Sequence, residues 1–385
     1  MPMLPKNPQQ WERIDRFLMS FSPKEKIAIV HDYDPDGLSS AVIMSKLIEK
    51  LRGKPADLHF TPPRGSKNTI APEIFAKLKQ KNITKVIFTD LGVHEDAAAV
   101  KKLEKQCEIL IIDHHTFFGD RTSERTAVAM PQLLADDIDP SRYNSSKIAY
   151  DLAHRHAGVD DLDWIAAIGT ISDMAGPAWN DFLQQTFTKY GLRQNPKDWF
   201  KSDLGSLSGM FFSAMAIDDK NVNYCFDVLM NSKKPLDALK DKKLTTLRKA
   251  FDKEINTWIQ KAPKLMEKHD NLKLIWYEIA PKYHINSPIS TILSLKPQYN
   301  DWVILIIEKD KGVLSCSGRC QSRRIAMNML LKDATAGLKD AAGGGHVPAA
   351  GAKVKLADAA VFKKRILDGL SKNLYTHKEK QQQTR

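Results

Sequence analysis

Short apolar runs alternate with amphipathic stretches through the N-terminal part of the chain. Three runs have the length of buried strands, and acidic residues follow each of them: 27–30, 85–89 and 109–112. A shorter run at 58–61 is a fourth strand candidate. Apolar residues at helical spacing predict helices at 11–21, 39–51, 74–78 and 96–105. Strands that alternate with helices predict an α/β domain whose parallel sheet is covered by helices on both faces.

The remaining pattern predicts more helices and a second group of strands. We expect a helix at 145–156, capped by Ser145 or Ser146, and an apolar segment at 164–172, whereas 177–232 is irregular with helical pieces. An amphipathic helix at 236–259 is expected to stop at Pro263. Further strands are predicted at 272–279, 303–308 and 313–317, and further helices at 327–331 and 357–374.

This pattern divides the chain into four expected parts. They are an α/β domain at 1–180, a helical insertion with a linker helix at 181–265, a smaller α/β domain at 266–372 and a disordered basic tail at 373–385.

Composition indicates a basic protein that favours a polyanionic partner. The 385 residues are 42% hydrophobic and carry a formal net charge of +12. Eight basic and three acidic residues lie between Lys233 and Lys253, a net of +5, either as a solvated outer face or as a surface for a polynucleotide backbone.

Other features of the sequence argue for a reducing, cytoplasmic setting. Four scattered cysteines do not make a disulfide framework, and Cys316 and Cys320 have no second pair with which to bind zinc. No apolar run is long enough to cross a bilayer, and residues 1–10 do not resemble a signal peptide. We expect no membrane partner.

Acids and histidines gather where the predicted strands end. Asp32, Asp34 and Asp36 follow the first strand, Asp90 follows the next, and Asp113, His114 and His115 follow the third. The carboxyl ends of parallel strands meet at one edge of a sheet, where open α/β sheets place their sites. Unpaired carboxylates crowded together are costly, so we expect a hard divalent cation such as manganese or magnesium among them.

A glycine run near the C-terminus has two interpretations. Gly343, Gly344 and Gly345 precede His346, and Arg319 lies upstream. Three successive glycines are often a flexible turn, but their exposed backbone N–H groups can also form an anion-binding nest. The adjoining histidine and the arginine make a phosphate contact the functional interpretation.

Taken in order, these motifs resemble the DHH phosphoesterase superfamily with a C-terminal DHHA1 domain. The motifs are Asp-x-Asp-x-Asp-Gly at 32–37, Asp90, Asp-His-His at 113–115, Asp173 and Gly-Gly-Gly-His at 343–346. The resemblance implies a site with two Mn²⁺ ions, or Mg²⁺ in their place, in the cleft between the two domains. It implies hydrolysis of phosphoester bonds there.

The resemblance also implies a role for each matching residue. Asp34, Asp36, Asp90, His114 and Asp173 match metal ligands, and Asp90 matches the acid that bridges both ions. Asp113 resembles the residue that orients the histidines, and His115 the one that contacts the substrate phosphate. Arg319, Gly344, Gly345 and His346 match a substrate-phosphate clamp.

The first motif differs from the form in many relatives, which begin it with a histidine ligand. The Asp-Tyr-Asp-Pro-Asp-Gly form at 32–37 is similar to that of RecJ-like exonucleases. Either Asp32 or His31 completes the first metal site, and we favour Asp32.

Three functions are compatible with this resemblance. The leading one is an exonuclease that degrades single-stranded DNA or RNA to mononucleotides. The second is a nanoRNase or nucleotide phosphatase for very short oligonucleotides or pAp-like substrates. The third is a non-catalytic scaffold in a replication or repair complex, which the intact ligand set disfavours. The preferred nucleic acid, the polarity, the substrate length, the oligomeric state and any replication or repair partner stay open.

Overall fold

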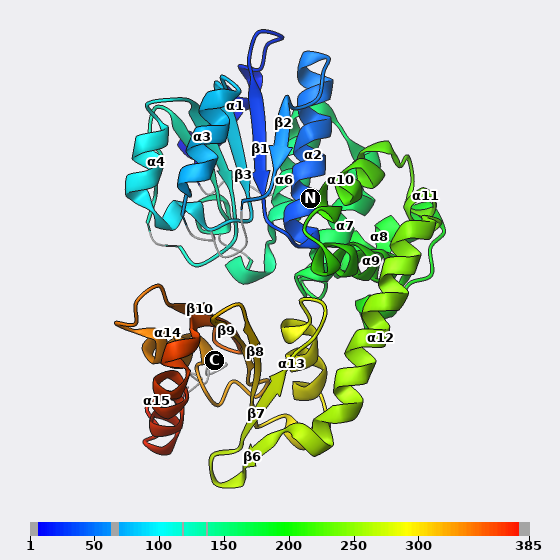
Figure 1. Ribbon diagram of the computed structural model, residues 1–385. Helices are drawn as coiled ribbons and strands as arrows, with labels where there is room; N and C mark the ends of the chain where they lie inside the picture. The colour runs from blue at the N-terminus through cyan, green and yellow to red at the C-terminus, as the bar shows by residue number, and fades with distance from the viewer. Residues whose placement is uncertain (1–6, 63–68, 118, 136–137, 377–385) are drawn as a thin grey trace, which may run out of the picture. The chain divides into compact units, whose positions relative to one another are not determined.

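A computed structural model describes residues 7–62, 69–117, 119–135 and 138–376 (Figure 1). The chain divides into two compact units, Met1–Arg248 and Lys249–Arg385. The division falls inside a helix, whereas the sequence predicts domain limits at 180/181 and 265/266. Residues 377–385 of the predicted basic tail lie outside the described residues. Within the described residues, no helix combines the length and apolar character needed to cross a membrane.

The first unit is built on a five-stranded parallel sheet in the order β2-β1-β3-β4-β5. Its strands are β1 (Ile27–His31), β2 (Leu58–Phe60), β3 (Lys85–Thr89), β4 (Glu108–Ile112) and β5 (Thr126–Ala129). The strand order reverses between β1 and β3, which is where open sheets of this kind leave a crevice at their carboxyl ends. The sequence predicted β1 to β4 but not β5.

Helices cover both faces of this sheet, as predicted. The helices are α1 (Pro8–Met19), α2 (Pro35–Arg52), α3 (Pro72–Gln80), α4 (Ala97–Leu103), α5 (Pro131–Leu134), α6 (Ser145–Ala157), α7 (Asp163–Ser172), α8 (Asn180–Tyr190), α9 (Asp203–Ile217), α10 (Asn221–Asn231) and α11 (Pro235–Leu239). Alternate residues of each strand face opposite sides. Ile29 and Ile87 face a core shared with α1, α2, α6 and α7, whereas Val30 and Phe88 face a core shared with α3 and α4.

Residues 177–232 hold three helices, α8, α9 and α10, so the helical pieces predicted there are present and are more regular than the pattern indicated. Glycine and serine in α9 lowered its apparent helix propensity. Close packing requires the glycine at 205, because a Cβ there would overlap the Trp199 backbone carbonyl oxygen. Helices α8, α9 and α10 all contribute to the core on the α2 face.

The predicted long helix is two helices, α11 and α12 (Lys242–Leu265). Asp241 interrupts it because its Oδ1 accepts the Leu244 backbone N–H at 2.8 Å and so caps α12. Pro263 does not stop the helix, which continues for two residues beyond it.

The second unit contains a six-stranded sheet in the order β10-β11-β9-β8-β7-β6, mixed in direction. Its elements are β6 (Glu267–His269), β7 (Leu274–Ile279), α13 (Asn286–Ser294), β8 (Val303–Asp310), β9 (Val313–Arg319), α14 (Met327–Thr335), β10 (Ala342–His346), β11 (Ala349–Lys355) and α15 (Ala359–Ser371). Residues of α14 and α15 share the core on one face, and α13 packs on β8 and β9. The sequence missed β6, α13, β10 and β11.

The glycine run is neither a flexible turn nor a nest, because it forms strand β10. Glycine is depleted in strands, so the pattern pointed elsewhere. A Cβ on Gly343 would overlap the Leu331 carbonyl oxygen of α14, and Gly345 has a φ of +139°. The missing side chains therefore let this edge strand lie against the helix.

Short 3₁₀ helices complete the described elements. They are η1 (Val93–Glu95), η2 (Pro140–Arg142), η3 (Asp160–Leu162), η4 (Trp199–Lys201), η5 (Asp270–Leu272), η6 (Pro297–Tyr299) and η7 (Leu356–Asp358).

Candidate functional site

The turn after β1 holds two of the predicted acids and starts α2. Asp34 caps the helix, because its Oδ1 accepts the Gly37 backbone N–H at 2.9 Å. Pro35 takes the first helical position, so the helix begins before the predicted start at Ser39. A Cβ on Gly37 would lie 2.8 Å from the Asp32 nitrogen, so this tight turn requires glycine.

Asp36 is buried and caps the amino end of α6. Its Oδ2 accepts the Ser145 backbone N–H at 2.9 Å, and its Oδ1 accepts the Ser146 N–H at 2.9 Å and Asn144 Nδ2 at 2.5 Å. The prediction that Ser145 or Ser146 caps α6 is therefore wrong. Gly169 of α7 leaves room for this carboxylate, since a Cβ there would lie 2.6 Å from Asp36 Oδ1. One lone-pair position on Oδ2 is left for a cation.

Asp90 follows β3 in a backbone conformation uncommon for a residue with a side chain. Its φ is +64°, and such conformations persist where the surroundings impose them, often at functional sites. The side chain is 2% exposed, and Ser145 Oγ donates to its Oδ1 at 3.1 Å. Burial raises the pKa of Asp90 well above its usual value, and Asp34 and Asp36 raise it further. A bound divalent cation would remove this penalty on the charged form.

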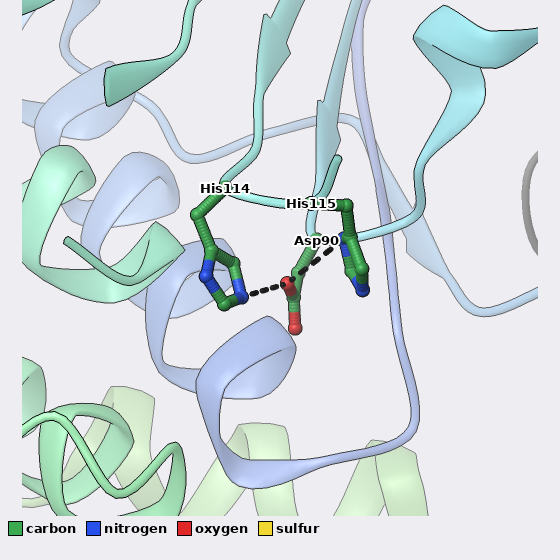
Figure 2. Close-up of side chains that lie close together, drawn as sticks. All are labelled: Asp90, His114 and His115. Carbon is green, nitrogen blue, oxygen red and sulfur yellow. Dashed lines mark ion pairs between the residues drawn. The ribbon is translucent and has the colours of Figure 1, made fainter. Parts of the chain in front are cut away.

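His114 lies between two acids, and Figure 2 shows its contact with the first. Its Nε2 is 3.3 Å from Asp90 Oδ1, and its Nδ1 is 3.6 Å from Asp173 Oδ2. Burial lowers the pKa of His114, but Asp173 and Asp90 outweigh it and hold that pKa well above its usual value. Burial raises the pKa of Asp173 to about 7, against the effect of His114. Cation binding here must therefore displace protons.

Asp113 holds the histidine pair in place through hydrogen bonds. Its Oδ1 accepts the backbone N–H of His114 at 2.8 Å, the N–H of His115 at 3.0 Å and His115 Nδ1 at 2.6 Å. Its Oδ2 accepts the Gly92 N–H at 2.6 Å. Burial disfavours the charged carboxylate, but His115 and His94 hold the pKa of Asp113 well below its usual value. This arrangement fits the predicted orienting role.

Five predicted side chains form two groups that share one acid. Ligand atoms lie within 4.8 Å of one another in each group, which are Asp32, Asp34 and Asp90, and Asp90, His114 and His115. Figure 2 shows the second group, with the two rings on either side of the carboxylate. Asp36 and Asp173 belong to neither group and adjoin them through the contacts above. Oxygen atoms with one or two imidazoles suit a hard divalent cation, so the residues present fit such ions.

His31 is not in either group. Its ring is fully buried and stacks at 6.2 Å from the ring of Phe226 and at 6.3 Å from that of His59. Its Nδ1 is 2.9 Å from the Asp32 carbonyl oxygen. Burial lowers the pKa of His31 to about 4, the value of a ring that stays neutral inside the protein. Of the two candidates for the first metal site, Asp32 is the one near the other ligands.

Three further residues support the site and were not predicted to do so from the sequence. Asn144 and Ser145 bind Asp36, and Ser145 also binds Asp90. Asn144 and Ser145 stand where a helix begins, so the sequence predicts that they cap that helix. The fold shows that they donate hydrogen bonds to acids that are distant in sequence. His94 was also missed, although its Nδ1 lies 3.7 Å from Asp113 Oδ2.

The predicted phosphate clamp lies on the second unit's sheet. Arg319 of β9 pairs with Ala349 of β11, which pairs with His346 of β10. Side chains of paired residues point to the same face, so Arg319 and His346 share a face with only a methyl group between them, about 10 Å apart at the backbone. His346 and Gly344 are exposed, and Gly345 at its positive φ shapes the strand beside them.

Comparison with known proteins identifies both domains. The model of the DHH family, N-terminal domain, matches residues 26–170, and that of the DHHA1 domain matches residues 285–372. The chain is 30% identical over 167 residues to the single-stranded-DNA-specific exonuclease RecJ of Bacillus subtilis. That match covers 42% of this chain and 21% of RecJ, so it spans only about a fifth of the length of that relative.

Solved structures agree on the fold. A crystal structure of exonuclease RecJ bound to manganese has a TM-score of 0.69 at 18% identity, with 96% of each chain covered. RecJ of Thermus thermophilus in complex with Mn²⁺ has a TM-score of 0.69 at 18% identity, over 97% of this chain and 56% of that one. CDC45 of Entamoeba histolytica has a TM-score of 0.59 at 11% identity, over 95% and 99%. The chain is therefore a RecJ-like member of the DHH superfamily with a C-terminal DHHA1 domain.

Proposed function

We propose that this protein is a divalent-metal-dependent phosphodiesterase, an exonuclease that removes nucleotides from single-stranded DNA or RNA. One observation carries the proposal. Acids and histidines from the ends of three adjacent strands form two groups, and Asp90 belongs to both. Burial raises the pKa of Asp90 well above its usual value. Such a crowd of carboxylates without a cation costs stability, so selection for a bound ion is the physical reason to keep it.

Each side chain has a role in this proposal. Asp32, Asp34, Asp90, His114 and Asp173 would hold the divalent ions, and Asp90 belongs to both groups of ligand-type side chains. Bound Mn²⁺ or Mg²⁺ would supply an activated water and neutralise charge on the phosphoryl oxygens. Asp36 fixes the N-terminus of α6 and adds negative charge that favours cation binding. Asp34 accepts a backbone N–H and Asp90 accepts the Ser145 hydroxyl, so the positions of these two carboxylates are set before substrate binds.

His115 is suited to contact the substrate phosphate. Its Nδ1 donates to Asp113, which fixes both the ring orientation and the position of one proton. The ring is 22% exposed, unlike the more deeply buried His114. Contact with the phosphate is then made through Nε2.

We assign the phosphate clamp to the face of the second unit's sheet that carries Arg319 and His346. A guanidinium binds phosphate with two parallel hydrogen bonds. Arg319 Nε is buried and has no hydrogen-bond acceptor among the described residues, so a phosphate oxygen would satisfy it. Gly344 offers no side chain that would prevent the backbone from approaching the ligand.

A polynucleotide is the proposed substrate because the chain is basic and because its sequence is similar to that of an exonuclease. The net charge of +12 and the net +5 between Lys233 and Lys253 favour a long polyanion. The sequence match is to an exonuclease named for single-stranded DNA. Retention of the full ligand set argues against a scaffold without catalysis.

The test uses purified protein with Mn²⁺ or Mg²⁺ and three end-labelled substrates, a long single-stranded DNA, a long RNA and a three-nucleotide RNA. Stepwise loss of a long strand supports the exonuclease, and the position of the label gives its polarity. Asp90→Asn should abolish this loss, while Asp161→Asn, an equal charge change at an exposed acid, should not. Cleavage of the three-nucleotide RNA alone would replace the exonuclease with a nanoRNase. No turnover would favour the scaffold.

A further inference from the structure

A cavity of about 870 Å³ in the first unit is not used by the proposed chemistry. Helices α6 and α8 and the segment that joins α7 to α8 contribute most of its lining. The residues that line it include the aromatic side chains of Tyr143, Tyr150, Trp179 and Phe182 and the charged side chains of Lys147 and Asp151. The volume is within the range of small-ligand sites and exceeds the space that one nucleotide needs.

Lys147 places a buried cation at the wall of this cavity. Its side chain is only 7% exposed, and its Nζ donates to Asp151 Oδ1 at 2.5 Å. An ammonium has three N–H donors, and Asp151 is its one acceptor among the described side chains. Burying a charge with unused donors is costly, so a ligand oxygen at this point would be stabilising.

Three aromatic rings surround the ammonium. Its Nζ lies 4.2 Å from the centroid of the Trp179 ring, 5.0 Å from that of Phe182 and 5.6 Å from that of Tyr150. All three rings are half-buried, so part of each is open to the cavity. Cation–π attraction holds the lysine in place and leaves flat apolar surface beside a hydrogen-bond donor.

The cavity is connected to the candidate metal centre by short, rigid segments. Tyr143 lies on the cavity and directly precedes Asn144, which binds Asp36. Trp179 Nε1 donates to the Arg142 carbonyl oxygen at 2.7 Å. Tyr150 lies about 7.5 Å further along α6 than Ser145, at the rise of an α-helix. A strand with its phosphate at the metal centre could therefore bring a neighbouring base here.

We infer that this cavity binds one nucleobase of the single-stranded substrate, stacked on its aromatic rings, with Lys147 donating to a carbonyl oxygen of the base. The inference rests on the proposed nuclease function. Stacking tolerates every base, because each has a π-face. The lysine adds a preference for bases with an exocyclic carbonyl oxygen that can accept its hydrogen bond, such as guanine, thymine and uracil, over adenine, which has no carbonyl group. The site thus predicts a base preference at one position of the strand.

The test is a double-mutant cycle between the protein and the nucleic acid. Binding of short single-stranded DNA is measured in EDTA, so that no strand is cut, with an abasic nucleotide moved through each position in turn. For the unmodified protein, one position should lose about 5- to 100-fold in affinity, the range for loss of a stacked base. Tyr150→Leu, which keeps apolar volume but removes the ring, should abolish that loss and leave the other positions unchanged.

Lys147→Met tests the hydrogen bond. The variant should bind adenine and thymine equally well at the sensitive position, whereas the unmodified protein prefers thymine there. Lys189→Met is the matched control, because Lys189 lies on α8 and is paired with Asp163 away from the cavity. The control removes the same charge and should keep the preference. Thermal unfolding of each variant establishes that it is folded.

The outcomes separate this inference from the proposed function. An abasic profile without a sensitive position, from protein that still degrades strands in Mn²⁺, overturns the base site alone. A sensitive position that persists unchanged in both Tyr150→Leu and Phe182→Leu also overturns it and assigns the base elsewhere. Protein that neither binds nor degrades any strand removes the proposed function, and the cavity would then suit an aromatic peptide.

Discussion

The Asp36 carboxylate accepts the Ser145 backbone N–H at 2.9 Å and so joins the first acidic motif to the amino end of α6. Ser145 in turn donates its hydroxyl to Asp90. An acid that reads as a metal ligand is therefore also a helix cap. Its contribution to stability can be separated from its contribution to metal binding.

We expect Asp36→Ala to destabilise the metal-free protein. The substitution leaves three buried donors without their acceptor. A buried donor that stays unpaired destabilises the folded protein by about 1–3 kcal/mol, and a donor that water reaches destabilises it by less. It also relieves repulsion with Asp90, which offsets only part of that loss. The measurement is the free energy of unfolding in urea with EDTA, and a decrease of about 2 kcal/mol is expected. Asp161→Asn should change it little, and an unchanged value for Asp36→Ala would contradict the capping role.

Gly169→Ala should lower stability although alanine is the better helix former. Helix propensity favours the substitution by up to about 1 kcal/mol. The new Cβ would overlap Ser146 Oγ and lie 2.6 Å from Asp36 Oδ1, so α6 and α7 must separate. Gly351→Ala is the control, since its Cβ would meet only the Cys316 carbonyl oxygen at 3.6 Å. Thermal unfolding should show a lower midpoint for the first variant alone.

Acid should destabilise the protein through His31. Burial lowers its pKa from 6.5 to about 4, so the folded state favours the neutral ring. The associated stability is fully present above pH 6.5 and decreases as the pH falls toward 4, by up to about 3 kcal/mol. His31→Leu should flatten the pH dependence of unfolding across that window in EDTA. His154→Gln, at an exposed histidine, should leave the slope as it is.

Divalent ions should stabilise the protein through Asp90. Mn²⁺ at about 100 times its dissociation constant raises the free energy of unfolding by about 2.7 kcal/mol when it binds only the folded state. Asp90→Asn keeps a side chain that tolerates the positive φ but removes the shared carboxylate. We expect the Mn²⁺-dependent rise in unfolding midpoint to be lost in this variant. A rise of equal size in both proteins would place the ions elsewhere.

Arg319→Lys should weaken substrate binding more than it slows turnover of bound substrate. Lysine keeps the charge but loses the planar fork that binds phosphate with two hydrogen bonds. We expect KM to rise about tenfold or more, with a smaller change in kcat. Lys309→Met is the control, since Lys309 is paired with Glu278 in the same sheet. An effect of equal size in the control would point to general electrostatics instead.

The sequence predicted the elements whose pattern is local. Strands β1, β3 and β4 are continuous apolar runs that end in acids, so both the sheet edge and its ligands were predicted from order alone. Strand β10 was missed and the extent of helix α9 was not predicted because close packing across the fold requires their glycines. Glycine is unfavourable in helices and strands, so propensity predicts a turn or loop at these positions.

The same limit applies to the site. Asp32 and His31 are neighbours in sequence, and both are ordinary ligand types. Successive residues of a strand point to opposite faces of the sheet, so His31 and Asp32 point in different directions. His31 lies on the side where His59 and Phe226 stack, so it is the one buried among rings. The contacts of Asn144 and Ser145 with distant acids could not be read from spacing.

The five side chains of the two candidate metal-binding groups lie on segments beyond the strand ends, outside both hydrophobic cores of the first unit. Apart from Asp36, which also caps α6, substitution of these side chains can therefore remove the proposed chemistry while the hydrophobic cores stay intact. A lineage that loses one of the candidate ligands other than Asp36 is expected to keep its fold and its surfaces. Such a protein is free to acquire a purely architectural role, so catalytic and non-catalytic descendants can diverge from one ancestor without any intermediate that fails to fold.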